Sequence, residues 1–122
     1  MVKNKKTVLI VDDETDVVDF LERFMNRFNI TVIKATGGED ALDLYQQYLP
    51  DWVFLDIQMP DKDGVSVLKE LKKKYPKSQV IMITGQDDKK VKERARKYGA
   101  LDYILKPLDL MELSQKVKKY IL

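Results

Sequence analysis

The chain has 122 residues, 44% of them hydrophobic and 34% charged, which is the composition of one globular domain and not of a disordered segment. Its 22 basic and 20 acidic side chains leave a net charge of +2, a balance that does not favour nucleic-acid binding. The sequence lacks cysteine and histidine, so any chemistry must rest on carboxylates, hydroxyls and lysines.

Five short apolar runs, rich in β-branched residues, alternate with longer segments of helical period. Apolarity within each run is continuous, which is typical of strands that are buried on both faces of a parallel sheet. The predicted strands are residues 8–11, 30–35, 52–55, 80–84 and 103–105.

Between the strands, apolar residues recur every three or four positions, and each such stripe predicts an amphipathic helix. Thr36 and Glu39 have the spacing of a capping box that would open the second helix, and Asp109 and Glu112 have it before the fifth. The stripes lie at 17–28, 41–48, 65–75, 88–98 and 110–120. Five strand–helix units in strict alternation predict a doubly wound α/β sandwich, one domain over residues 1–122.

Ionic or hydroxyl side chains close four of the five predicted strands. In an open parallel sheet, ligands bind beyond the carboxyl ends of the strands, so these side chains should share one rim. Asp12 and Asp13 follow the first strand, Asp56 follows the third, Thr84 ends the fourth and Lys106 follows the fifth. The second strand leads only into a capping loop, which suits an edge position.

This predicted rim carries three carboxylates and one ammonium group, an excess of negative charge that a cation would offset. Oxygen ligands without histidine or cysteine favour a hard ion, Mg²⁺, bound by Asp12 or Asp13 with Asp56 and a nearby loop carbonyl. A metal ion, a lysine and a threonine hydroxyl can all hold phosphoryl oxygens, and a central carboxylate can act as the nucleophile. The residues alone therefore suggest that Asp56 accepts a phosphoryl group.

Plainer interpretations exist for the same residues. Asp12 and Asp13 could be acids that precede a helix beginning near Thr15, and Glu14 is interpreted only in that way. Considered by itself, Tyr103 could simply be a core residue, because an aromatic side chain on a strand usually is. The basic runs within 69–74, 89–97 and 116–119 are interpreted as solvent-exposed helix faces.

Four stretches, VDDE, LDIQMPDKDG, MITGQ and YILKP, resemble in order and spacing the motifs of response regulator receiver domains, over residues 6–122. The resemblance implies a flavodoxin-like fold with strand order 2-1-3-4-5 and a role in a two-component system or phosphorelay. It also implies a signalling domain that catalyses only its own phosphotransfer and dephosphorylation.

Carried onto this sequence, the resemblance implies that Asp56 is the phosphoacceptor. Asp12, Asp13 and Asp56 would hold Mg²⁺ together with the backbone carbonyl of Gln58, and Lys106 would pair with the phosphoryl group.

The resemblance further implies a switch. Thr84 would hydrogen-bond the phosphoryl group when it arrives, and Tyr103 would move inward as Thr84 reorients. Gln58 and Gln86 would line the path of the attacking water and tune the phosphoryl lifetime. A cis peptide is expected between Lys106 and Pro107.

The implied phosphodonor is a histidine kinase or a histidine phosphotransfer protein. The implied output surface, built from the fourth helix, fifth strand and fifth helix, would contact a downstream domain or protein, or a second copy in a phosphorylation-dependent homodimer. We expect no direct nucleic-acid or membrane binding. The sequence contains no apolar run of membrane-spanning length, and we expect the domain in the cytoplasm.

Two alternatives remain open at this stage. A Mg²⁺-dependent phosphatase with an aspartyl-phosphate intermediate would want a second acid two residues after the nucleophile, where this chain has Gln58. A phosphate-independent binding module would be expected to have lost the acidic pair or the lysine. A nucleotide site is disfavoured because acids, not a glycine-rich loop, follow the first strand.

Overall fold

The computed structural model describes residues 6–122, and strands alternate with helices throughout. The elements are β1 (Thr7–Val11), α1 (Thr15–Asn26), β2 (Thr31–Ala35), α2 (Gly38–Tyr48), β3 (Trp52–Leu55), α3 (Gly64–Lys74), β4 (Val80–Thr84), α4 (Lys89–Lys97), β5 (Asp102–Leu105), α5 (Leu110–Lys116) and a terminal π-helical turn, η1 (Val117–Ile121). No helix in this described range is both long and apolar enough to cross a membrane.

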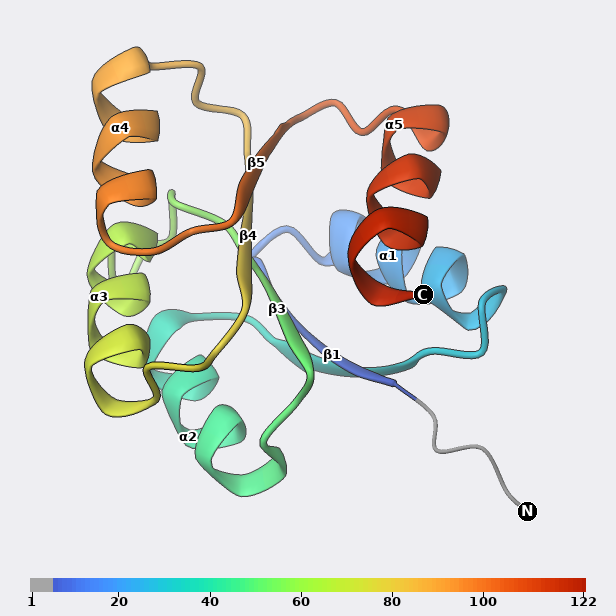
Figure 1. The fold of residues 1–122 in the computed structure, drawn as a ribbon, viewed down its shortest axis with the longest axis horizontal. Helices are drawn as coiled ribbons and strands as arrows, with labels where there is room; N and C mark the ends of the chain where they lie inside the picture. The colour runs from blue at the N-terminus through green and yellow to red at the C-terminus, as the bar shows by residue number, and fades with distance from the viewer. Residues whose placement is uncertain (1–5) are drawn as a thin grey trace.

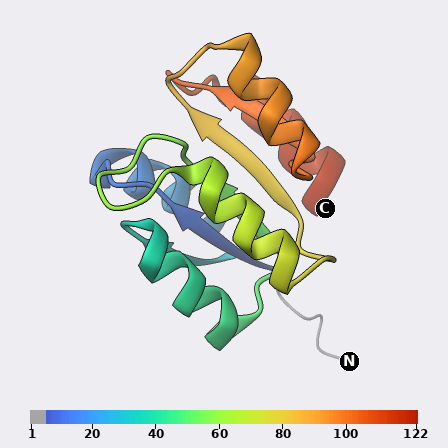
Figure 2. The same cartoon turned by 90° about the vertical axis from the view of Figure 1, so that its left-hand side faces the viewer.

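The strands form one parallel sheet in the order β2-β1-β3-β4-β5, which confirms the predicted flavodoxin-like architecture. Figure 1 shows α1 and α5 on one face of this sheet and α2, α3 and α4 on the other. In Figure 2 the latter three helices lie in a row across their face.

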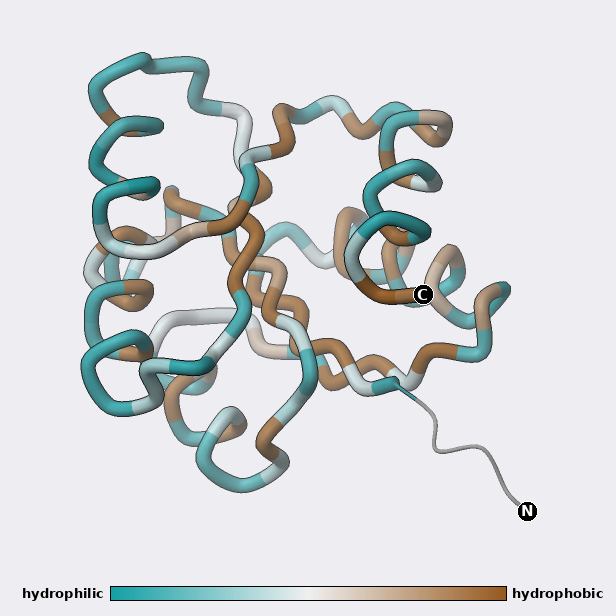
Figure 3. Tube along the Cα trace, viewed as in Figure 1, coloured by the Kyte–Doolittle hydropathy of each residue, from teal (hydrophilic) through white to brown (hydrophobic). Residues whose placement is uncertain are grey.

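The core consists of two apolar layers separated by the sheet. Along β1, Val8 and Ile10 pack toward α1 and α5, whereas Leu9 and Val11 pack toward the opposite helices. The strand is therefore buried on both faces, which explains the continuous apolar run in the sequence. Figure 3 shows the same distribution, with hydrophobic residues along the strands and hydrophilic residues on the outer sides of the helices.

The predicted capping box before α2 is wrong. Gly37 is the N-cap residue of α2, and the capping carboxylate comes from Asp61 in the loop between β3 and α3. Asp61 accepts hydrogen bonds from the backbone N–H groups of Gly38 and Glu39, at 3.1 and 3.2 Å. These bonds hold the pKa of Asp61 below its ordinary value.

Two other helix boundaries follow local signals. Asp109 caps α5 by accepting from the N–H groups of Met111 and Glu112, at 2.8 and 3.3 Å. Gly99 ends α4 with a φ of 104°, a left-handed conformation that favours glycine. The expected stop is therefore present after α4, and the expected Asp109 cap is present before α5.

Candidate functional site

The register of the sheet brings the ends of β1 and β3 together. Val11 pairs with Leu55, so Asp12 and Asp56, the next residues along each strand, lie side by side. Both are almost completely buried, whereas Asp13 is exposed. Carboxylate oxygens of Asp12, Asp13 and Asp56 all lie within 4.8 Å of one another, as a cluster of hard ligands requires.

Lys106 reaches this cluster from the end of β5. Its Nζ lies 2.8 Å from Asp12 Oδ2 and 3.2 Å from Asp56 Oδ2. The peptide between Lys106 and Pro107 is cis. Burial opposes the charge of Lys106, but hydrogen bonds to Asp12 and Glu14 outweigh it and raise the pKa of the ammonium group. The lysine is therefore held as a cation against the phosphoacceptor candidate.

Glu14 belongs to this cluster, which the sequence interpretation missed. Glu14 occupies the N-cap position of α1, as expected of a helix-start acid, but its carboxylate Oε1 lies 2.7 Å from Lys106 Nζ. The two residues are 92 positions apart in the chain. The strand order does not predict this contact, because β3 and β4 lie between β1 and β5.

The carboxylate of Asp12 is buried beside another acid, Asp56. Burial raises its pKa to about 6, and Asp56 adds to the rise, whereas hydrogen bonds from Lys106 and the N–H of Glu14 partly offset it. The Glu14 N–H lies 2.9 Å from Asp12 Oδ1. A carboxylate in this environment is stabilised by a nearby cation, so the oxygen donor set fits Mg²⁺.

The loop that follows Asp56 is tightly packed against β3. The N–H of Gln58 donates to Asp56 Oδ1 at 3.3 Å, and the N–H of Gly64 donates to the carbonyl of Ile57 at 2.8 Å. A Cβ on Gly64 would lie 2.0 Å from the backbone oxygen of Asp56. Only glycine permits this approach, which fixes the start of α3 beneath the site.

Thr84 lies at the same rim, fully buried at the end of β4. It pairs with Leu105, so Lys106 is its neighbour, and the N–H of Lys106 donates to the Thr84 carbonyl at 2.9 Å. The Thr84 hydroxyl accepts a hydrogen bond from the N–H of Gln86 at 3.3 Å. The side chain therefore connects the rim to the loop between β4 and α4.

Tyr103 is half-buried on β5 and is bonded to the same loop. Its hydroxyl donates to the backbone carbonyl of Gln86 at 2.6 Å. Burial raises the pKa of Tyr103 to about 12, with further contributions from Asp87, Asp56 and Asp88, so the phenol remains a donor at neutral pH. Tyr103 and Thr84 thus contact the same loop residue, Gln86: Tyr103 binds its carbonyl and Thr84 binds its N–H.

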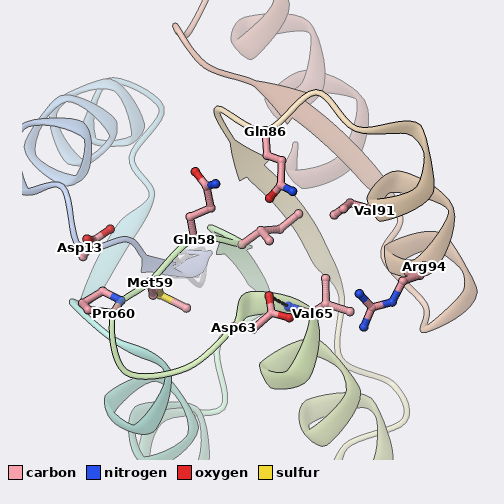
Figure 4. Close-up of a pocket in the computed structure, with 10 residues that line it drawn as sticks. Asp13, Gln58, Met59, Pro60, Asp63, Val65, Gln86, Val91 and Arg94 are labelled. Carbon is pink, nitrogen blue, oxygen red and sulfur yellow. Dashed lines mark hydrogen bonds between the residues drawn. The ribbon is translucent and has the colours of Figure 1, made fainter.

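An open cavity of about 640 Å³ lies beside Asp13, between the loop after β3 and the start of α4. Gln58 and Gln86 point into it from opposite sides, and Val91 and Arg94 line its far wall on α4 (Figure 4). The cavity is large enough for a small molecule or a partner side chain to approach the acidic cluster.

The family model of the response regulator receiver domain matches residues 8–118. This chain belongs to the response regulator receiver domain family. As a CheY-like receiver domain of two-component systems, it is a signalling module.

Solved structures agree with this assignment. A putative response regulator from Chloroflexus aurantiacus J-10-fl is 32% identical, with a TM-score of 0.88 over 96% of this chain and 98% of that chain. A chain of the CheX–CheY–BeF3–Mg²⁺ complex from Borrelia burgdorferi is 31% identical, with a TM-score of 0.91 over 96% and 90% of the two chains. A CheY-like receiver domain from Methanospirillum hungatei JF-1 is 28% identical, with a TM-score of 0.90 over 95% and 93%.

Proposed function

We propose that this receiver domain accepts a phosphoryl group on Asp56, with Mg²⁺ held by Asp12, Asp13, Asp56 and the backbone carbonyl of Gln58. The observation that carries the proposal is the set of three carboxylates within 4.8 Å of one another, with Lys106 in contact with two of them. The related chain from Borrelia burgdorferi was crystallised in a complex with BeF3 and Mg²⁺, which supports the same metal here.

The proposed reaction moves the phosphoryl group from a phosphohistidine to a carboxylate. A carboxylate oxygen of Asp56 attacks phosphorus, the phosphorus–nitrogen bond breaks, and the imidazole leaves with its bonding electron pair. Lys106 offsets negative charge on Asp56 and on the transferred oxygens. Bound Mg²⁺ would supply further positive charge next to these oxygens.

The donor would be a histidine kinase or a histidine phosphotransfer protein, and the domain would catalyse no reaction except its own phosphorylation and dephosphorylation. We expect the exchange in the cytoplasm, as the sequence predicts. Gln58 and Gln86 project into the cavity beside the acidic cluster, which supports a role in admitting or excluding the hydrolytic water.

The phosphoryl group adds roughly two negative charges at the rim. The Thr84 hydroxyl would donate a hydrogen bond to the phosphoryl oxygens. Because Thr84 and Tyr103 both contact Gln86, the loop and β5 would move together. The response would shift an existing equilibrium at the surface formed by α4, β5 and α5. A downstream protein, an output domain or a second copy of the chain would bind that surface.

The test is incubation with a small phosphodonor and Mg²⁺, followed by intact-mass measurement. Wild type and the surface control Asp43→Asn should each gain one phosphoryl group, whereas Asp56→Asn should gain none. Removal of Mg²⁺ by a chelator should suppress the gain. Equal labelling of Asp56→Asn would contradict the assignment, and steady turnover of phosphate esters would favour the phosphatase alternative.

A further inference from the structure

Lys92 contacts two other parts of the molecule from its position in α4. Its Nζ lies 2.6 Å from Asp87 Oδ1 in the loop between β4 and α4. The same nitrogen lies 5.3 Å from the centre of the Tyr103 ring on β5, within the range of a cation–π contact. The basic run of α4 was interpreted as solvent-exposed, but Lys92 is half-buried and packed against neighbours.

These contacts close a ring of interactions around Tyr103. The tyrosine hydroxyl binds the carbonyl of Gln86, and the next residue, Asp87, is the acid that pairs with Lys92. Lys92, Asp87, Gln86 and Tyr103 therefore connect α4, the loop and β5 in one continuous path. The small cavity between α4 and β5, about 30 Å³, is lined by both Lys92 and Tyr103.

Apolar packing of α4 is sparse, and Val91 is only partly buried against the core. Ala95 is the only buried residue of this helix, all of which lies in the described range. In the preceding loop, a Cβ on Gly85 would meet no described atom within 4 Å. Polar contacts therefore contribute to where the start of α4 and the loop lie relative to β5.

We propose that Lys92 is a positioning residue that holds Tyr103 in its loop-bound position. This inference rests on the proposed function, because it takes the loop-bound position as the one that phosphorylation favours. By thermodynamic reciprocity, a contact that favours this position of Tyr103 also favours the phosphorylated state at equilibrium. A partly exposed cation–π contact corresponds to an effect of about two- to fivefold.

The first test measures the position of Tyr103 without any phosphodonor. The side-chain NMR signals of Tyr103 are compared in wild type, Lys92→Met, Lys92→Arg and the control Lys89→Met, which removes a charge from the same helix. We expect Lys92→Met to shift the ring signals, and Lys92→Arg and Lys89→Met to leave them near their wild-type positions. Unchanged ring signals in Lys92→Met would overturn the proposal.

The second test is a double-mutant cycle on the equilibrium binding of BeF3 with Mg²⁺, as a mimic of the phosphoryl group. Lys92→Met should weaken this binding about two- to fivefold relative to wild type. It should have no effect in a Tyr103→Ala background, and Lys89→Met should have none in either background. An equal weakening with and without Tyr103 would overturn the proposal, because Lys92 would then act as a general charge.

The two tests separate this inference from the proposed function. If wild type takes up no phosphoryl group, the function assigned to Asp56 is wrong, and the NMR comparison still decides whether Lys92 positions Tyr103. If wild type is phosphorylated and Lys92→Met matches it in both measurements, the function stands and the role of Lys92 is refuted.

Discussion

The two loops that flank the acidic cluster are built in different ways. On the β3 side, Gly64 lies so close to the loop after β3 that a Cβ would clash with the backbone oxygen of Asp56, and α3 buries apolar residues along its length. On the β4 side, a Cβ on Gly85 would enter open space, and α4 buries only Ala95 among its described residues. One side is fixed by packing, and the other is held by hydrogen bonds and ion pairs.

This difference suits the proposed function, in which the same rim would bind a metal ion and respond to phosphorylation. In the proposed function, Asp56 and the carbonyl of Gln58 would need fixed positions to hold a metal ion, and tight packing would supply them. The loop after Thr84 would have to take more than one position, and polar contacts of small net energy would permit that. Variants matched across the two sides test the comparison directly.

The largest effect is expected from Gly64→Ala. The added methyl group would meet the Asp56 carbonyl oxygen at 2.0 Å and must displace backbone. We expect a loss of about 3 kcal/mol in the free energy of unfolding, measured by denaturant titration, because the overpacked atom is main chain.

Gly85→Ala is the matched variant on the other side, where the methyl group enters open space. It should change the free energy of unfolding little. Similar losses in the two alanine variants would show that the β4 side is as tightly packed as the β3 side, and would break the comparison.

A smaller effect is expected from the helix caps. Asp88 accepts hydrogen bonds from the N–H groups of Lys90 and Val91, at 2.9 and 3.4 Å, within its own helix. Asp88→Ala should lower the free energy of unfolding by about 1 kcal/mol and increase amide exchange at the start of α4.

Asp61→Ala removes a cap from α2, a different element, so faster exchange should appear at Gly38 and Glu39. Exchange changes confined to the loop that carries Asp61 would contradict its capping role.

The sheet and its rim were predictable because they depend on local pattern and topology. The continuous apolar runs at 8–11, 52–55 and 80–84 are strands of the observed sheet, and alternation with helices makes them parallel. Once strands are parallel, residues after their carboxyl ends must meet, so Asp12 and Asp56 could be paired from the sequence.

The errors all concern side-chain contacts outside the local helix pattern. Glu39 has the spacing of a capping-box residue, but Asp61, from another loop, caps the helix instead. Glu14 reaches a lysine at the far end of the chain. Lys92 resembles its basic neighbours in sequence, but its side chain contacts the Tyr103 ring and Asp87. Side-chain reach and loop path decide these contacts, and neither is encoded in spacing.

The smallest effect is expected from Asp102, and it depends on pH. On β5, next to Tyr103, the Asp102 carboxylate accepts hydrogen bonds from Lys116 and from the Tyr120 hydroxyl, the latter at 2.8 Å. Burial raises the pKa of Asp102, but the bonds from Lys116, the Tyr103 N–H and Tyr120 outweigh it and hold the pKa below 3.8.

A carboxyl group with a lowered pKa in the folded state stabilises the fold above its unfolded pKa, and the contribution is lost as pH falls through the folded value. Asp102→Asn should therefore cost on the order of 1 kcal/mol or less at neutral pH, since the pair is partly exposed, and the difference from wild type should shrink below about pH 4. The measurement is urea unfolding of both proteins across this pH range. A difference that stays constant into acid would mean that Asp102 acts through packing, and that β5 and α5 are held in the same way as α3.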